Sequence, residues 1–468
     1  MIFFSRYFST KSIYLYFGVL IVCNLYFFSR ALPLIWWFFG LVEVVGFFYY
    51  SNLYTRVWTK FTEKSFLSKL FKTALIIRII WVIFSYFFYI IFTGIPFEIG
   101  SADAQGYHNE GMWVADMIST GDINSYFEYI NGKYSDMGYP LYLGCQYFIT
   151  WKSILIARLI KAFLSAYTCV LVYKVSKSNM GDEVAKMAAV FCMLMPNLIY
   201  YTGLHTKEVE MVFLTVLFIE RSDFLLRVRS FNFINLFMPI LIALILFFFR
   251  TVLGTTAIFA LFSGLLFTSN KIMVIGKRWL LIIWMVIAGL YLVGSKISTE
   301  VEQVWNARQI NQVNSIKFRT ERINGNTFAK YASSAIFVPM IFVLPFPTLI
   351  YTPNQENQQM INGGNYVKNI MSFFLLLAIY WVVVNNKWRD YILLGTFTIG
   401  YLLVISLSAF AQSERFHQPA LPFILVMAAF GVSKVTNKHK LYFKWYMILI
   451  FFAIIGWSYF KLAGRGLA

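Results

Sequence analysis

Long apolar stretches recur along the whole chain, and short segments that hold most of the polar residues separate them. An apolar run of about 20 residues is long enough to cross a bilayer as a helix. The pattern therefore predicts an all-α polytopic membrane protein with about 13 transmembrane helices. The expected spans lie near residues 13–28, 33–50, 73–92, 154–173, 187–201, 209–220, 231–249, 251–268, 279–293, 367–384, 391–410, 419–432 and 446–460.

Two apolar segments do not fit this pattern of full spans. Residues 140–150 are too few to cross, so we expect an interfacial or re-entrant helix there. The segment 335–351 contains Pro339, Pro345 and Pro347, and each proline removes a backbone donor. We expect a broken, re-entrant element that dips in from outside, although a full crossing would reverse the side of every later loop.

Basic residues predict which loops face the cytoplasm, because Lys and Arg concentrate in cytoplasmic loops. The N-terminus and the loop 51–72 are basic and are expected inside, whereas the segment after residue 92 is acidic and is expected outside. The predicted organisation has four parts: a two-span anchor with its basic loop (1–72), a transmembrane core (73–295) that includes an external juxtamembrane-helix loop (93–152), an external loop with the proline-broken segment (296–366), and C-terminal transmembrane helices (367–468).

Composition agrees with a membrane protein and argues against a nucleic-acid partner. The chain is 59% hydrophobic and 13% charged, whereas a soluble domain has about 25% charged residues. The formal net charge of +19 comes from basic residues in short loops between apolar runs, where they attract anionic lipid and fix topology. The four cysteines lie in apolar segments and show neither a disulfide framework nor a metal-ligand spacing.

Ionisable residues gather on the side of the membrane that this topology places outside. Three of the four histidines fall there, each close in sequence to a carboxylate. Because an ionisable residue at membrane depth is a functional candidate, the set suggests a site for an anionic substrate at the lipid boundary. The candidates are Asp103, Tyr107, His108, Arg158, Lys161, His205, Lys207, Glu208, Arg250, Glu414, Arg415 and His417.

Structural roles are alternatives for several of these residues. Asp103 could cap a juxtamembrane helix, and Tyr107, on the same helical face, could be an interfacial aromatic residue. Arg158 and Lys161 could extend to lipid headgroups without touching a substrate, as we expect of Arg78 near the inner side. No HxH or HxxxH spacing occurs, so the sequence gives only a weak signal for a divalent metal and leaves that cofactor open.

Five motifs follow one another in an order that resembles a known family. They are DAQGYH (103–108), GYPLYLGCQYFITW (138–151), ARLIKAFLSAYTCVLVYKVSK (157–177), PNLIYYTGLHTKE (196–208) and ERFHQPALP (414–422). Together they resemble the GT-C superfamily of polyprenyl-phosphate-sugar-dependent glycosyltransferases, in particular the family 39 branch of dolichyl-phosphate-mannose-protein mannosyltransferases and aminoarabinose transferases. The likeness covers about residues 73–224 and, less closely, 390–433.

The resemblance implies an enzyme that moves a sugar from a polyprenyl-phosphate donor to a hydroxyl of a glycan, lipid or protein, with inversion. The implied location is the bacterial cytoplasmic membrane, with the active site facing outward. Asp103 would act as general base or hold a metal, and Arg415, with Lys207 as second choice, would bind the leaving phosphate. The other candidates would contact substrate. This mechanism requires Asp103 and Arg415 to share one pocket.

Two other interpretations stay open. An O-antigen polymerase or ligase would use arginines of the long external loop, here Arg308, Arg319 and Arg322. A transporter or flippase for polysaccharide or lipid-linked sugar would show internal repeats and charges at the membrane midplane. The sequence shows no such repeat, and the candidate charges gather at one face.

Overall fold

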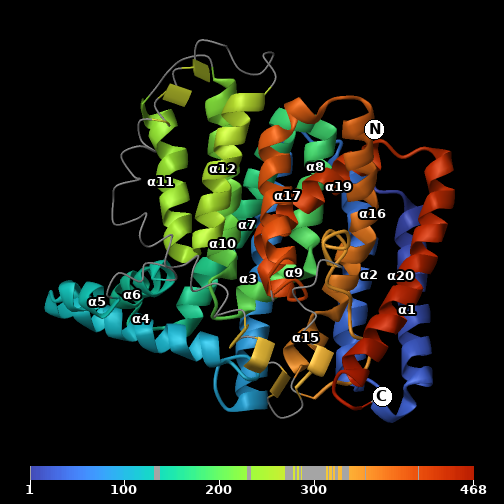
Figure 1. Ribbon diagram of the computed structural model, residues 1–468, viewed down its shortest axis with the longest axis horizontal. Coiled ribbons are helices and arrows are strands. Elements are labelled where there is room, and N and C mark those ends of the chain that lie inside the picture. Colours follow the sequence, from blue (N-terminus) through green and yellow to red (C-terminus); the bar gives the residue numbers. More distant parts are fainter. Residues whose placement is uncertain are drawn as a thin grey trace.

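The computed structural model describes residues 2–130, 137–228, 233–268, 337–353, 355–408 and 410–467, together with scattered positions between 278 and 328. Every regular element in these ranges is a helix, and most of the helices run side by side as one bundle (Figure 1). A single large apolar cluster joins helices from the first to the last part of the described chain.

Seven of the described helices are long and apolar enough to span a membrane. They are α1 (Arg6–Tyr26), α2 (Leu34–Trp58), α3 (Glu63–Thr93), α7 (Ile154–Met180), α16 (Asn362–Val384), the continuous pair α18 (Glu414–His417) and α19 (Leu421–Ser433), and α20 (Asn437–Ala463). The chain is therefore a polytopic helical membrane protein, as the apolar pattern predicts.

Other helices of the bundle fall short of this length or apolarity. A bent pair, α8 (Asp182–Leu194) and α9 (Pro196–Tyr200), would be an eighth span. The remaining helices are α10 (Glu208–Arg227), α11 (Phe233–Phe249), α12 (Thr251–Phe267) and α17 (Ile392–Ser406), of which α12 packs on α11 and α17. The span expected at 279–293 falls almost entirely outside the described residues. The described chain thus does not reach the expected number of 13 long spans.

The polar stretch 51–72 is mostly helical, so the prediction of a long loop there was wrong. α2 continues to Trp58 and α3 begins at Glu63, and only residues 59–62 connect them. The stretch contains neither proline nor glycine, so nothing in it stops a helix. Thr62 and Glu63 supply the residue types that favour a helix start.

The span expected at 187–201 is broken, with a bend of 53° between α8 and the helical turns that follow. Pro196 has no N–H, so the carbonyl of Cys192 loses its helical donor. Arg78, fully buried in α3, donates to the carbonyls of Cys192 (3.4 Å) and Met193 (3.2 Å) instead. Arg78 therefore supports this break, and the expectation that it reaches the headgroups was wrong.

The described part of the proline-rich segment, residues 337–353, forms turns and irregular backbone rather than a spanning helix. Side chains of α16 satisfy its carbonyls: Asn369 donates to Pro345 at 3.0 Å, and Ser372 donates to Phe342 at 2.7 Å. Irregular backbone at membrane depth needs such protein partners. The expectation of a broken element is confirmed.

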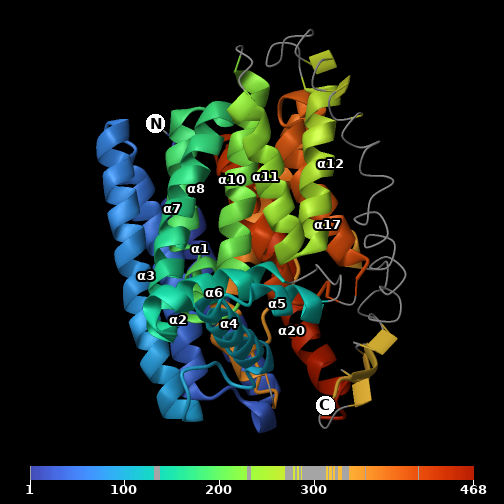
Figure 2. The ribbon, with the colours of Figure 1, turned by 90° about the vertical axis from the view of Figure 1, so that its left-hand side faces the viewer.

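Three helices project sideways from the lower part of the bundle in Figure 1, next to the lower end of α11, and we call this region the α4 end (Figures 1 and 2). They are α4 (Ala102–Thr120), α5 (Ile123–Ile130) and α6 (Gly138–Thr150). α6 has only 13 residues, which confirms the short helix expected there. α4 and α6 pack closely because Gly111 has no side chain: a Cβ there would lie 2.9 Å from that of Leu143.

Candidate functional site

One arginine joins two carboxylates at the α4 end. Arg415, on α18, donates hydrogen bonds to Asp103 on α4 and to Glu208 on α10. Asp103 lies 312 positions from Arg415 in the chain, and Glu208 lies 207 positions from it. We call Asp103, Arg415 and Glu208 the arginine triad. The structure thus brings together the two residues that the proposed chemistry requires in one pocket.

The three side chains of the triad become progressively more buried, from Asp103 through Arg415 to Glu208. The side chain of Asp103 is 61% exposed, that of Arg415 is 22% exposed, and that of Glu208 is fully buried. Asp103 and Glu208 each lie in the first turn of their helix, where the helix dipole favours a negative charge. The arrangement therefore presents one open carboxylate beside a guanidinium that a buried carboxylate anchors from behind.

Arg250 and Lys207 extend the positive charge around the triad. Arg250 occupies the junction between α11 and α12, its guanidinium lies 4.5 Å from the ring centre of Phe416, and its charge acts on Glu208. Lys207 donates to the carbonyl of Phe249 at 3.0 Å. The contact of Lys207 links the end of α11 to the start of α10, and the contact of Arg250 links the turn between α11 and α12 to α18. The segments that carry Glu208 and Arg415 are therefore both fixed to this turn.

Arg158 and Lys161 do not extend to the headgroups, so that alternative was wrong. The two residues belong to α7, and their side chains are fully buried. Arg158 donates to the carbonyl of Pro96, and Lys161 donates to the carbonyl of Leu204 at 3.2 Å. Lys161 also lies 3.7 Å from the carboxylate of Glu210. The irregular connections before α4 and before α10 expose carbonyls inside the protein, and these two cations satisfy them.

A tyrosine that the sequence did not single out links two candidate histidines. The hydroxyl of Tyr147, on α6, lies 2.7 Å from Nδ1 of His108 and 2.8 Å from Nε2 of His205. The Phe97 ring packs against both imidazoles. Burial, with the charge of Arg158, lowers the pKa of His108. Burial, with the charges of Lys161 and Arg158, holds the pKa of His205 well below its usual value. Both shifts favour the neutral imidazole.

Glu98, which precedes α4, is a further buried carboxylate near the cations. Its side chain is buried, and its Oε2 makes no hydrogen bond within the described part of the chain. Burial raises the pKa of Glu98, and its own backbone N–H and the charges of Arg158 and Arg415 offset part of that rise. The sequence showed an acidic loop here but gave no reason to choose Glu98, because only the fold buries it.

Three further candidates, Glu414, His417 and Tyr107, contact residues that do not belong to the arginine triad. Tyr201 donates a hydrogen bond to Glu414. His417 is buried and accepts from Lys368 at 2.8 Å, while its other ring nitrogen lies 2.9 Å from the carbonyl of Ala411. Both nitrogens are thus engaged within the protein, so the prediction that His417 contacts substrate is not supported by its surroundings.

Tyr107 packs edge-to-face on Tyr139 of α6, with ring centres 5.0 Å apart. The Lys207 ammonium lies 5.6 Å from the centre of the Tyr107 ring. Tyr107 therefore sits between the neighbouring helix and a candidate cation, one helical turn from Asp103.

The described residues contain no group of three or more His, Cys, Asp or Glu side chains placed to hold a metal ion. Asp103 and Glu208 are both paired with Arg415. The arrangement is therefore a guanidinium held between one exposed and one buried carboxylate.

Two cavities lie near the α4 half of the bundle. A small one of about 230 Å³ adjoins Glu208 and is also lined by Ser165, Tyr201 and Gln418. A much larger groove of about 1200 Å³ runs between α2 and α3, and its lining is mostly apolar but includes Glu43 and Tyr200. Tyr200 donates to the carbonyl of Asn357 at 3.3 Å. Leu194, Pro196 and Ile199 also line the groove, so it extends along the break between α8 and α9.

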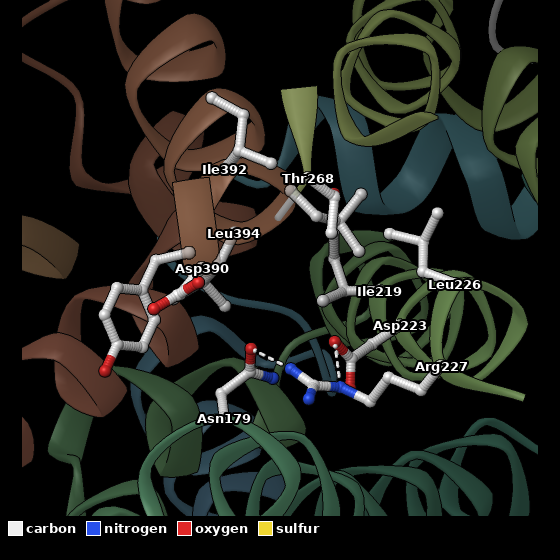
Figure 3. A pocket seen from close by; sticks show the side chains of 11 residues that line it. Asn179, Ile219, Asp223, Leu226, Arg227, Thr268, Asp390, Ile392 and Leu394 are labelled. Carbon is white, nitrogen blue, oxygen red and sulfur yellow. Dashed lines mark hydrogen bonds and ion pairs between the residues drawn. The ribbon is translucent and has the colours of Figure 1, made fainter. Parts of the chain in front are cut away.

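A cleft of about 300 Å³ lies between the last turns of α10 and the start of α17, at the opposite end of α10 from Glu208. Figure 3 shows the side chains that line it. Arg227, near the end of α10, pairs with Asp223 at 2.9 Å and donates to Asn179 at 2.9 Å. Asp390 lines the same cleft. Arg227 and Asp223 are one turn apart on one helix, so this pair follows from local geometry.

Comparison of the chain with protein-family models, with curated proteins and with solved structures finds no match. The function proposed below therefore depends on the residues of the site and on the fold that places them.

Proposed function

We propose that the chain is a membrane glycosyltransferase with a GT-C-like bundle of about 13 transmembrane helices, which moves a sugar from a polyprenyl-phosphate donor to an acceptor hydroxyl. The site is at the α4 end and faces away from the cytoplasm of a bacterial cell. The contact between Asp103 and Arg415 is the observation that carries this proposal. It brings a solvent-open carboxylate and a guanidinium into direct contact, and these are the two groups that the proposed reaction needs.

The proposed step uses each member of the arginine triad. The oxygen of the acceptor hydroxyl attacks the anomeric carbon, and Asp103 takes the hydroxyl proton. The bond between the anomeric carbon and the phosphate oxygen breaks, and its electron pair stays on the phosphate. Arg415 stabilises that charge with planar, permanently protonated donors. Glu208 holds the guanidinium in place, and direct displacement inverts the anomeric carbon.

The apolar groove between α2 and α3 supports a lipid-linked donor. Its walls include Phe39, Trp81 and Phe84, and it adjoins helix surfaces that leave large apolar side chains exposed. A hydrocarbon tail in this groove would bury apolar surface, while its phosphate would extend past Tyr200 toward the polar site. Arg415 and Arg250 are the candidate phosphate partners that are not fully buried.

The test is mass spectrometry of envelope glycans and lipid-linked saccharides from cells that make the chain or its Asp103→Ala variant. We expect one glycan to lose a sugar in the variant and the lipid-linked form of that sugar to accumulate. Folded protein in both strains is measured by thermal unfolding after purification. Identical glycans in both strains, with equal amounts of folded protein, would reject the transferase proposal.

A second candidate is a transporter of lipid-linked sugar, and the broken span favours it. Transporters often build their sites at interrupted helices, and the buried Arg78 of α3 donates hydrogen bonds to carbonyls just before the break between α8 and α9. Reconstituted vesicles separate the two: movement of a lipid-linked sugar across the bilayer without a new glycosidic bond indicates a transporter. The arginines that a polymerase or ligase would use, Arg308, Arg319 and Arg322, lie outside the described residues, and their joint replacement tests that third function.

A further inference from the structure

A second groove lies between α16 and α20, at the end opposite to α4. Its volume is about 1420 Å³. In Figure 1 the ribbon of α20 is tilted relative to α16, and the two helices diverge toward the N-terminal end of α20. The lining residues are Phe373, Leu376, Leu377, Tyr380, Thr436, Lys438, His439, Tyr442, Trp445, Tyr446 and Leu449.

The polar mouth of this groove is basic. Lys438 and His439, in the first turn of α20, line it, and no residue that lines it is Asp or Glu. The whole of α20 contains no acidic residue, and Lys440 and Lys444 add further positive charge to its first two turns. Among the lining residues Lys438 supplies the positive charge, Nδ1 of His439 accepts from the backbone N–H of Thr436 at 2.9 Å, and an occupant of the mouth meets no carboxylate.

Below the mouth the groove is apolar and open to the surroundings. Tyr380, Tyr442 and Trp445 are more than half exposed, and such aromatic residues concentrate at the membrane–water interface. Leu376 and Leu449 continue the apolar lining toward the middle of the bundle. The groove is therefore complementary to an amphiphilic molecule, because it has a basic mouth at the interface and an apolar lining beneath the mouth.

We propose that this groove binds an anionic phospholipid, with its phosphate at Lys438 and His439 and its acyl chains along α16 and α20. A zwitterionic lipid would fill the channel but gain little from the basic mouth. Free phosphate would meet the mouth but leave the channel without an occupant. The charge of the mouth and the apolar lining together select a lipid that carries both features.

The chain offers a matched control for this binding site. Lys440 is two residues from Lys438, but its ammonium lies 5.6 Å from the ring of Tyr7 on α1 and it does not line the groove. Lys438→Gln and Lys440→Gln remove the same charge from the same helical turn. They differ in whether the charge faces the groove.

The experiment is native mass spectrometry of the full chain, purified in detergent and titrated with phosphatidylglycerol or phosphatidylcholine. We expect tighter retention of phosphatidylglycerol, a loss of about five-fold in Lys438→Gln, and little change in Lys440→Gln. Leu376→Trp, which fills the channel, should reduce retention while both lysines remain. Millimolar inorganic phosphate should not displace the lipid.

Three results would overturn the proposal. Equal loss in both lysine variants would mean general attraction to a basic surface. No preference for phosphatidylglycerol would remove the role of the mouth, and displacement by phosphate alone would remove the role of the channel. The thermal unfolding of each variant is measured as well, so that a loss of folded protein is not mistaken for a loss of lipid binding.

Discussion

The bundle carries an arginine–carboxylate pair at each end, and the two pairs arise in different ways. Asp223 and Arg227 are one helical turn apart, so any sequence that forms α10 brings them together. Asp103 and Arg415 are 312 positions apart and meet only when α4, α10 and α18 are all in place. A local pair stabilises its own helix by a few tenths of a kcal/mol. A long-range pair that the whole bundle maintains is a stronger indication of a site.

Asp103→Asn should have the largest effect on this comparison. Loss of the base should reduce sugar transfer by about 10²–10⁴-fold. Asp223→Asn removes a carboxylate from the other pair and should change transfer by less than about two-fold. Transfer is measured as the rate of formation of the glycan that differs between the strains described above. Equal losses in the two variants would mean that the pairs do not differ in function.

Replacement of each arginine by lysine comes next. Lysine keeps the charge but loses the planar donors that bind phosphate, so Arg415→Lys should reduce transfer by about 10²–10³-fold. Arg227→Lys should leave the rate within about two-fold. If Arg415→Lys retains full transfer, the guanidinium is not needed at the phosphate.

Stability should separate the pairs more modestly. Glu208→Ala leaves the guanidinium of Arg415 without its buried partner, which should cost about 3–5 kcal/mol. Asp223→Ala breaks a partly exposed pair, which should cost at most about 1 kcal/mol. Unfolding of the purified chain by heat or denaturant measures both. A smaller cost for Glu208→Ala than for Asp223→Ala would contradict the structural account.

The smallest expected effect is the dependence of stability on pH that two histidines at the α4 end produce. Burial lowers the pKa of His108 and holds that of His205 well below its usual value. The unfolded chain therefore binds protons more readily below about pH 6.5. The contribution of the two histidines to the free energy of unfolding should be fully present above that pH and should fall as the pH is lowered. Replacing both histidines with glutamine should flatten the thermal-unfolding profile between pH 7 and pH 5, and an unchanged profile would argue against neutral imidazoles.

The sequence predicted the membrane class and most helices because long apolar runs report directly on burial in lipid. It failed where a tertiary contact decides the structure. Arg78 resembles a residue that reaches the headgroups, yet it is buried because a broken helix provides carbonyls for it. Tyr147 lies in a stretch that reads as apolar, and its role as a bridge depends on two histidines from other segments.

Part of the candidate site was nevertheless visible in the sequence. Asp103, Glu208 and Arg415 stand out as charges that directly precede or follow apolar segments on one predicted side. What the sequence could not provide was depth: Lys161 and Arg158 look as accessible as Arg415, but only the fold shows that they are committed to backbone carbonyls. The catalytic and binding roles of all these residues remain predictions.

A double-mutant cycle on Asp103 and Arg415 tests the central claim most directly. Transfer rates are measured for the native chain, Asp103→Asn, Arg415→Lys and the double variant. If the two side chains act as one unit, the double variant should be about as slow as the slower single variant. If the two losses multiply instead, the residues act independently, and the account of a shared site is contradicted.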